Sequence, residues 1–567
     1  MVQPDSTPTT KLDYFKKQVS AMDQERSSFI PHYRELAEFI QPRKGRFFIT
    51  DRNKGDRRYN KIINSRATQA HRTAQAGLFS GVASPSRPWF MTETEDPELM
   101  EFGPVKVFLH KTDRLLNSIF AQSNFYNMTP VMFGELLLFG TGAMSHVDDF
   151  ENVARFYTHT AGSYFISQND KYEVDRFARE LEMTVGQIVS QFGLENCSVA
   201  VRDQYSKGNY HQWYPVTQFI EPNSAFNENK LESKFKKFSS VYYEPGNNDK
   251  NQFLSMGGFD EFPVYCPRWS VTGEDIYGTD CPAMTALGDI KGLQIEERRK
   301  AQAIDKLVNP PLHGPASVRN VPVQSLAGGL TIYDGGNERE LKPIYQVDPR
   351  LNELRADMDS VERRIDSAFY VDLFLAITNM EGIQPRNQFE LAQRNQERLL
   401  QLGPVLERLH GEFLDKVIDR TFNQCVRAGI LPDIPEELQG QDLKVRYVSS
   451  LAQAQRAVVT QGIERTAAFV TSLAAADPNN PGIWDKFDRD QAIDEYAQAT
   501  GAVPTIIVPD DKVAEVREGR AQQQARMQQM QMAQMGADMI GKAGNVDLSK
   551  DTLGKRVGEA VNQMTGR

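Results

Sequence analysis

The segment from Tyr277 to Pro432 most constrains what this chain can fold into. In it, charged helical patterns alternate with stretches rich in proline and glycine. The expected parts, in chain order, are a helix over 282–308, an insert over 309–347, a helix over 349–374, a loop over 375–388 and a long helix that contains Gly403-Pro404. Two long helices that flank a small insert form an elongated part rather than a closed pocket. The segment therefore favours a role in assembly over a role in catalysis.

The helix expected over 349–374 carries a heptad repeat of apolar residues. Its members are Leu351, Leu354, Met358, Val361, Ile365 and Ala368. Most residues between them are charged, so the helix should pack one narrow stripe against a neighbour and keep both flanks in water. The helix over 282–308 follows the same plan, and the glycine pairs near 328 and 335 predict a hairpin in the insert. In the third helix Pro404 lacks a backbone donor, which predicts a kink at Gly403-Pro404.

Composition limits the class of protein. The 567 residues are enough for about three or four domain-sized units. A net charge of −10 excludes a protein whose whole surface grips nucleic acid, although it allows a conduit past which DNA slides. The four cysteines are widely spaced and are expected to be free thiols. The start of the chain lacks the apolar core of a signal peptide, and no apolar run approaches the roughly 18 residues of a membrane span. We therefore expect synthesis in the cytoplasm and no membrane partner.

The rest of the chain divides into a helical start, a β-rich middle and a helical end. Helix is expected over 11–40 with a break or kink at Pro31, and again over 65–79, 104–121 and 129–138, the last ending at Gly140-Thr141-Gly142. Strands are expected over 154–165, 172–179, 197–202, 240–243 and 444–448. Between them, Thr184 and Gln187 predict a capping box at the start of a helix over 184–192. Helices over 452–475, 490–500 and 513–540 complete the pattern, the last being rich in glutamine and methionine.

Catalytic motifs are missing from the sequence. There is no P-loop, no GxSxG and no HExxH, and Ser145 stands where GxGxxG needs its third glycine. Asp357 and Asp359 form a DxD, but residues two apart on a helix point to different faces and are badly placed to share a metal. Asp148-Asp149 beside His146 is a candidate metal cluster on a loop. The alternative interpretation of these residues is an ordinary polar turn. We expect no enzymatic activity, no cofactor and no metal.

Two basic stretches are candidates for contact with phosphate. The first lies within residues 43–61, and its members considered for phosphate or subunit contacts are Arg43, Lys44, Arg46, Arg57 and Arg58. A solvated loop explains this run as well. In the second, Lys234, Lys236 and Lys237 alternate with Phe235 and Phe238, which would suit base stacking or the protected edge of a strand.

Several segments, taken in order, resemble the head-to-tail connecting (portal) proteins of T7-like short-tailed bacteriophages. They are FIQPRKGRF, NSRATQAHRTAQAGLFSGVASPSRPWF, LLLFGTGAM, TVGQIVSQFG, FPVYCPRWSVTGEDIYGTDCPAM and NMEGIQPRNQFELAQRNQERLLQLGPVLERL. The resemblance covers roughly residues 10–500 and rests on the order of these segments and on the layout of helix, insert, helix, loop and kinked helix.

The resemblance implies an α+β portal fold, mainly helical, with a mixed β region in the wing, a helix–hairpin–helix stem and clip, and a helical crown. The implied parts are an N-terminal wing over 1–276, a first stem helix over 277–308, a clip over 309–347, a second stem helix over 348–374, a tunnel loop over 375–388, a kinked wing helix over 389–431, a crown over 432–510 and a C-terminal helix with a flexible tail over 511–567. In the tunnel loop, the residues implied to face a DNA channel are Asn379, Glu381, Gln384, Arg386 and Asn387. Arg386 would be the main basic group there.

The family also implies partners and a place. These are a homo-oligomeric ring of about twelve subunits, viral double-stranded DNA that passes without sequence-specific binding, the large subunit of the terminase motor, a tail adaptor protein, and the major capsid and scaffolding proteins. The protein would sit at the portal vertex of the virion, and DNA would be packaged and later ejected through it. A DNA-processing nuclease built on the acidic pairs, and a structural or tail adaptor protein without a channel, are the alternatives.

Overall fold

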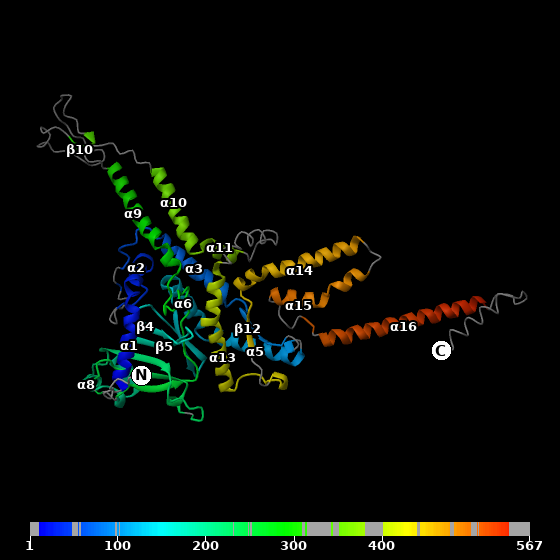
Figure 1. Cartoon of the computed structure of the whole chain (residues 1–567), viewed down its shortest axis with the longest axis horizontal. Coiled ribbons are helices and arrows are strands. Elements are labelled where there is room, and N and C mark those ends of the chain that lie inside the picture. Colours follow the sequence, from blue (N-terminus) through cyan, green and yellow to red (C-terminus); the bar gives the residue numbers. More distant parts are fainter. Residues whose placement is uncertain are drawn as a thin grey trace, which may run out of the picture.

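The computed structural model describes most of the chain and shows an α+β architecture (Figure 1). The residues described are 11–47, 55, 58–96, 99–100, 102–230, 232–247, 249, 252–308, 312–313, 342–343, 351–379, 401–438, 443–476, 481–500, 507–508 and 510–543. A body of helices and antiparallel sheets lies at the centre of the molecule, a pair of helices projects from it on one side, and three further helices extend on another (Figure 1). The fold class expected from the sequence is confirmed.

The helical start of the chain breaks near Pro31, as predicted. Helix α1 covers Lys11–Ser27 and α2 covers Ile30–Ile40, with Pro31 in the first turn of α2, where its missing donor costs nothing. One face of α1, formed by Leu12, Phe15, Val19 and Met22, is buried against the largest sheet.

Three further helices form the centre of the main hydrophobic core. They are α3 (Arg66–Val82), α5 (Gly103–Gln122) and α6 (Phe125–Phe139). Almost every residue in the second half of α6 is buried. The helix ends at Gly140, whose φ of 73° is a left-handed conformation that suits glycine, so the predicted C-cap is confirmed.

The β-rich middle forms two sheets, and a third pairs distant parts of the chain. Five strands lie in the order β4-β5-β6-β7-β8, three in the order β3-β2-β9, and β1 pairs with β12. The bounds are β1 Phe90–Thr94, β2 Ala143–Asp149, β3 Val153–His159, β4 Tyr164–Gln168, β5 Val174–Thr184, β6 Trp213–Pro222, β7 Phe238–Tyr243, β8 Ser255–Phe259, β9 Val264–Tyr265 and β12 Leu443–Tyr447. The predicted strand over 154–165 is in fact two strands, separated by a turn in which Gly162 has a φ of 88°.

One predicted strand is wrong. Residues 197–202 do not extend, because a helix, α8 (Val199–Ser206), begins there. The hydroxyl of Ser198 accepts a hydrogen bond from the backbone N–H of Val201 at 3.3 Å, and Glu244 holds Ser198 in place through the hydroxyl and the backbone N–H. The N-cap therefore overrides the β propensity of the valines.

The predicted capping box at Thr184 is confirmed. Helix α7 covers Val185–Phe192; the Thr184 hydroxyl accepts from the Gln187 N–H at 3.3 Å, and the Gln187 side chain accepts from the Thr184 N–H at 2.9 Å.

Replacing Thr184 by alanine should destabilise α7 by about 1 kcal/mol, measured as faster hydrogen exchange of its amides. Thr184→Ser keeps the oxygen and is the control; equal exchange in both variants would contradict the prediction.

A partly buried carboxyl on α5 should make stability depend on pH. Burial raises the pKa of Asp113 to about 7, although the Thr92 N–H and hydroxyl both donate to it. Between pH of about 4 and 7 the folded chain holds a proton that the unfolded chain has lost, so this contribution to stability falls as the pH rises through that window. Asp113→Asn should remove this part of the slope of the unfolding free energy against pH. The exposed Asp170, changed to Asn, is the control, and an unchanged slope in Asp113→Asn would refute the assignment.

The segment that opened the sequence argument forms the projecting pair of helices. Helices α9 (Pro282–Val308) and α10 (Leu351–Ala368) run side by side out of the body, and β10 (Leu312–His313) pairs antiparallel with β11 (Lys342–Pro343) beyond them (Figure 1). We call α9 and α10 together the arm. The heptad stripe is confirmed, since Met358, Val361 and Ile365 are buried and Leu354 and Ala368 are partly buried. The hairpin predicted near 328–336 lies outside the described residues.

The second arm helix is shorter than predicted. It ends at Ala368, Tyr370 adopts a left-handed φ of 55°, and a new helix, α11 (Val371–Asn379), starts directly afterwards. The periodic pattern hid this break because the apolar residues continue across it. Helix α11 also covers the first five residues of the loop predicted over 375–388, and the remaining residues of that loop lie outside the described part.

The third helix of the segment contains an unpredicted π-helical turn. Residues 401–409 are helical, His410–Leu414 form the π turn, and α13 continues over Asp415–Ala428. The helix runs unbroken through Gly403 and Pro404. A kink there stays a prediction, because the residues before 401 are not described. Beyond β12, the predicted C-terminal helices are confirmed as α14 (Ser450–Ala476), α15 (Arg489–Thr500) and α16 (Asp510–Ala543). Among the helices described, none has the length and apolarity to cross a bilayer.

Candidate functional site

The base of the arm is fixed to the body by buried polar contacts. Gln294 of α9 is almost fully buried; its side chain accepts the N–H groups of Ile63 and Asn64 at 2.6 and 2.8 Å and donates to the Asn64 carbonyl at 3.0 Å. On α10, Asp366 accepts from the Nε of Arg66 at 2.8 Å. The segment that leads into α3 is therefore joined to both arm helices, which gives the arm a fixed direction relative to the body.

The outer half of the arm exposes a basic stripe. Five exposed residues of α9 at helical positions i, i+3, i+4, i+7 and i+11 form it: Ile295, Arg298, Arg299, Gln302 and Lys306. Ile295 is 50% exposed. This spacing places the five side chains on one side of the helix. The stripe is a surface that a single copy of the chain leaves uncovered.

Helix α10 carries exposed carboxylates at the same level. Asp357 and Asp359 are both exposed and point to different sides of the helix, as the sequence predicted. Within the described residues, neither forms an ion pair, nor do Arg298 and Arg299. No group of three metal-ligating side chains occurs in the described part of the chain, so the two aspartates do not make a two-metal nuclease centre there.

Helix α11 lies on α3, close to the point where the chain leaves the arm. Phe369, Leu373 and Phe374 are buried in the main core. Gly77 of α3 faces Phe374 so closely that a Cβ atom added at Gly77 would lie 2.3 Å from the Cβ of Phe374. The Tyr370 ring lies beside Trp269, with centroids 6.4 Å apart. This arrangement sets where residues 380 and beyond begin.

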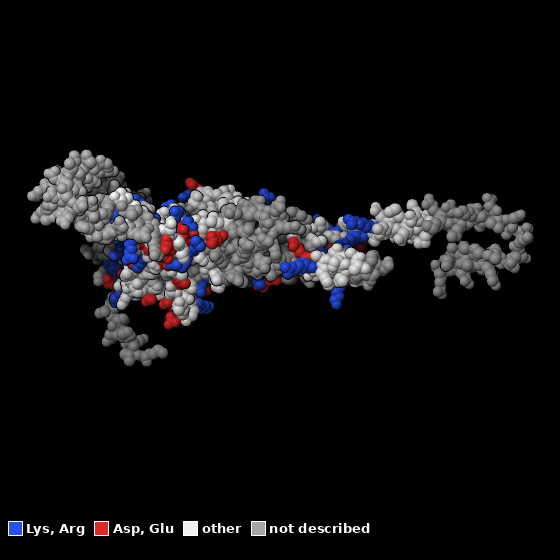
Figure 2. All heavy atoms as spheres, turned by 90° about the horizontal axis from the view of Figure 1, so that it is seen from above, with Lys and Arg blue, Asp and Glu red and all other residues white. Residues whose placement is uncertain are grey.

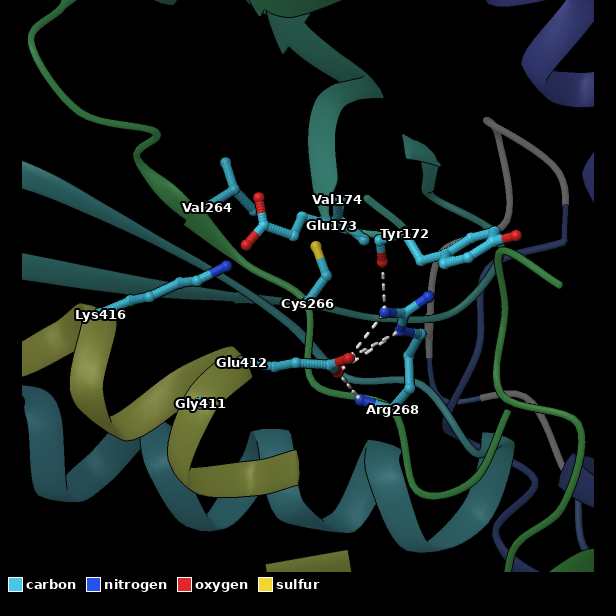
Figure 3. Close-up of a pocket in the computed structure, with 9 residues that line it drawn as sticks. All are labelled: Tyr172, Glu173, Val174, Val264, Cys266, Arg268, Gly411, Glu412 and Lys416. Atoms are coloured by element: carbon cyan, nitrogen blue, oxygen red, sulfur yellow. Dashed lines mark hydrogen bonds and ion pairs between the residues drawn. The ribbon is translucent and has the colours of Figure 1, made fainter. Parts of the chain in front are cut away.

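A polar cavity of about 260 Å³ lies beside the π turn (Figure 3). Arg268 points across it to Glu412 of the π turn, with Nη2 and Oε1 2.6 Å apart, and also donates to the Tyr172 carbonyl at 3.0 Å (Figure 3). The Arg268 backbone N–H donates to Glu412 at 2.8 Å. Burial raises the pKa of the Cys266 thiol to about 12, so it stays protonated at neutral pH and is not a nucleophile. The cavity therefore holds a structural ion pair and has no catalytic arrangement among the side chains that line it.

The candidate metal cluster at His146 is contradicted. His146 lies in β2 rather than in a loop, and burial lowers its pKa well below the ordinary range. One ring nitrogen bonds the hydroxyl of Tyr265 at 2.7 Å, and the other bonds Gln424 at 2.8 Å. Gln424 also donates to Asp148, which lies next to the buried Arg420. Both nitrogens are used inside the protein, where they join β2 to α13.

The basic run at 43–61 is partly internal. The Lys44 ammonium forms an ion pair with the buried Glu135 at 3.4 Å, so it serves the core of the subunit. Arg43 and Arg46 are exposed on a loop in which the Gly45 N–H donates to the Thr160 hydroxyl and the Arg46 N–H donates to the Ala161 carbonyl. Arg58 is partly buried. Arg57 lies outside the described residues. A phosphate or subunit contact by Arg43, Arg46 and Arg58 stays a prediction.

The second basic stretch leads into β7, whose first residue is Phe238, and its short 3-10 helix, Ser233–Phe235, lies beside β8, an edge strand of the five-stranded sheet. A role in protecting that edge stays a prediction. Lys236 pairs with Asp260 at 2.8 Å, and the ammonium of Lys234 lies 5.0 Å from the centroid of the Phe235 ring. These contacts occupy the two lysines locally.

The residues predicted to face a channel are mostly beyond the described part. Asn379 is the last residue of α11. Glu381, Gln384, Arg386 and Asn387 lie outside the described residues, whereas Gly403 and Pro404 lie in a helix. Over the face seen in Figure 2, acidic and basic side chains are intermixed on the body and do not gather by sign.

Comparison with known proteins gives a consistent family. The family model described as "Bacteriophage head to tail connecting protein" matches residues 13–508. The chain is 41% identical over 529 residues to the "Portal protein" of Salmonella phage epsilon15, covering 93% of this chain and 94% of that protein. It is 42% identical over 528 residues to the "Probable portal protein" of Bordetella phage BPP-1, with the same shares covered.

Solved structures resemble the chain only distantly. A chain of the virion of a native gene transfer agent particle matches 72% of this chain and 92% of its own, with a TM-score of 0.32 and 11% identity. A likeness at this level carries no argument about function.

Proposed function

The chain belongs to the family of bacteriophage head-to-tail connecting proteins, and from this premise we propose what each of its parts does. It is a portal protein, a structural subunit of the virion at the junction of head and tail, whose ring forms the channel for the viral DNA. The observation that carries this function is the identity of 41% to a portal protein over 93% of the chain. Because the match covers nearly the full length of both proteins, it is not explained by a single domain that two otherwise different proteins share.

The parts follow the order of the chain. We assign the arm helices α9 and α10 to the stem, the insert over 309–347 to the clip, and residues 375–388, which begin in α11, to the channel-facing segment. The body up to residue 276 and the helix through the π turn form the wing, and α14 and α15 form the crown. The clip would contact the terminase motor during packaging and a tail adaptor afterwards, and the body would contact the capsid and scaffolding proteins.

The surface of the arm supports a contact between copies through the stem. In a closed ring each subunit uses two different faces, so a patch on one copy meets a different patch on the next. The basic stripe of α9 and the aspartates of α10 are complementary patches of this kind. Asp357 and Asp359 lie on different sides of α10. Whichever side of α10 meets the stripe of the neighbouring copy, it therefore presents a carboxylate.

The charge of the chain supports the passage of DNA without retention. A protein that neutralised many phosphates would bind DNA tightly at low salt and arrest its movement. A net charge of −10 avoids such binding over most of the surface. Arg386 is the basic group that we propose for brief phosphate contact inside the channel.

Electron microscopy of the purified full-length chain tests the proposal. We expect rings with a central channel. We also expect native mass spectrometry of these rings to give a mass that corresponds to a fixed number of copies. A chain that stays monomeric also in the presence of scaffolding protein would contradict the portal assignment. Reconstruction of the ring would show which residues of 375–388 face the channel.

A further inference from the structure

One helix of the body determines where the channel-facing segment starts. Helix α11 leads directly into residues 380–388, and it packs along α3. Its apolar residues Val371, Leu373 and Phe374 are buried in the same core as α3. The position of α11 is thus tied to the body as well as to the arm.

The contact between the two helices depends on a glycine. At Gly77 the helices approach so closely that an added Cβ would lie 2.3 Å from the Cβ and 2.4 Å from the Cγ of Phe374, far inside ordinary contact. Phe374 is 1% exposed, and it lies in the main core, where side chains are closely packed. Gly77 therefore forms a notch in α3 that accepts the base of the Phe374 side chain.

The turn before α11 separates it from the arm. Tyr370 has a φ of 55°, a left-handed conformation that is unfavourable for a residue other than glycine. The backbone N–H of Phe374 donates to the Tyr370 carbonyl at 3.1 Å, so the turn also starts the new helix. The break at Tyr370 allows α11 to follow the surface of α3 rather than the axis of α10.

We propose that Gly77 is a positioning residue for the channel: by seating Phe374, it sets the distance of α11 from α3 and hence the position of residues 380–388 in the ring. This inference rests on the proposed portal function. According to this inference, the position of the channel-facing segment depends on α3, a helix of the wing, through the contact between Gly77 and Phe374. It does not depend on the stem alone.

A matched pair of substitutions on α3 tests the inference. In Gly77→Ala, α11 must move by about 1 Å to restore ordinary contact with Phe374. Gly81, four residues on, has room, because an added Cβ there would lie 3.6 Å from Leu451. Both substitutions replace a helical glycine of α3 by alanine, so Gly81→Ala controls for the change of residue type, with Gly81 one residue from the end of the helix.

The measurements are made on assembled rings of the full chain. Cryo-EM should show α11 and residues 380–388 displaced in Gly77→Ala rings and unchanged in Gly81→Ala rings. Particles built with equal amounts of ring should retain less double-stranded DNA with Gly77→Ala only. A role in stability alone would change the melting temperature and the yield of rings, but not the DNA retained per assembled ring.

A second variant keeps the test decisive if Gly77→Ala does not fold. Phe374→Leu retains the Cβ in the notch but removes the ring, so hydrogen exchange in α11 should become faster and DNA retention should fall. The inference would be overturned if Phe374→Leu showed the same hydrogen exchange in α11 and the same DNA retention as the wild type. It would also be overturned if residues 380–388 were not displaced in folded Gly77→Ala rings. If residues 380–388 of wild-type rings lie away from the channel, the proposed assignment of that segment fails instead.

Discussion

Reversing the charge of the basic stripe should abolish ring assembly. In Arg298→Glu/Arg299→Glu, the stripe of α9 would face Asp357 or Asp359 of the neighbouring copy with like charge, which costs affinity at every interface of the ring. A loss of only about 1.4 kcal/mol per interface lowers each association constant about tenfold, and a closed ring repeats that loss at each contact. We expect the variant to remain monomeric at concentrations where the wild type forms rings, as measured by native mass spectrometry.

Asp357→Lys/Asp359→Lys should have the same effect and gives a test of pairing. A chain with the reversed α9 and a chain with the reversed α10 each repel their own copies. Mixed in equal amounts, they should form rings in which the two chains alternate, because each α9 then faces an α10 of opposite charge. Rings of the mixture must contain an even number of subunits.

The control changes charge on a different part of the molecule. Asp203→Lys on α8 changes charge on an exposed helix of the body and should leave assembly unchanged. If either reversed chain forms rings alone as readily as the wild type, the stripe is not a contact between copies. If assembly is restored neither in the mixture nor in one chain that carries all four substitutions, Arg298→Glu/Arg299→Glu/Asp357→Lys/Asp359→Lys, the two patches do not meet.

Removing Arg268 should destabilise the subunit strongly. Its side chain is 6% exposed and is paired with Glu412, and it also donates to Gln168 and to the carbonyls of Tyr172 and Ile276. In Arg268→Met, Glu412 keeps a charge in a site that lost its partner, which typically costs about 3–5 kcal/mol. We expect a loss of that order in the free energy of unfolding by urea, and faster hydrogen exchange in the π turn.

Two further variants separate the ion pair from a general effect. Arg268→Met/Glu412→Leu removes both charges and should be less destabilised than Arg268→Met alone. Lys207→Met removes an ion pair with Asp203 in which both side chains are about half exposed, and it should change stability by less than about 1 kcal/mol. Equal losses in Arg268→Met and Lys207→Met would show that the buried pair has no special role.

The elements that the sequence predicted well are those decided by local chemistry. The capping box at Thr184, the break at Pro31 and the left-handed glycine at Gly140 each depend on a few neighbouring residues. The heptad stripe of α10 was predictable for a similar reason, since its period alone shows which face is buried. That the four cysteines are free thiols was also expected from their spacing.

The elements that were missed depend on contacts between distant parts of the chain. The strand predicted over 197–202 is a helix because Glu244, far along the sequence, supports its N-cap. The break at Tyr370 and the π turn at His410–Leu414 have no signal in the apolar pattern, which continues through both. The sequence placed His146 on a loop, in an ordinary polar turn or a metal cluster, because its partners, Tyr265 and Gln424, are brought to it only by folding.

The sequence by itself determined that this is an elongated, acidic protein without catalytic motifs, and its ordered segments indicated the family. Net charge, periodicity and the order of motifs can be read along the chain. They do not depend on which residues are in contact in the folded protein. Only the tertiary structure decided which charges remain outside and which are internal. Lys44 is paired with Glu135 inside the body, whereas Arg298 and Arg299 stay exposed on the arm. Burial and pairing depend on the packing of distant segments, and a charged residue looks the same in the sequence whichever environment it meets.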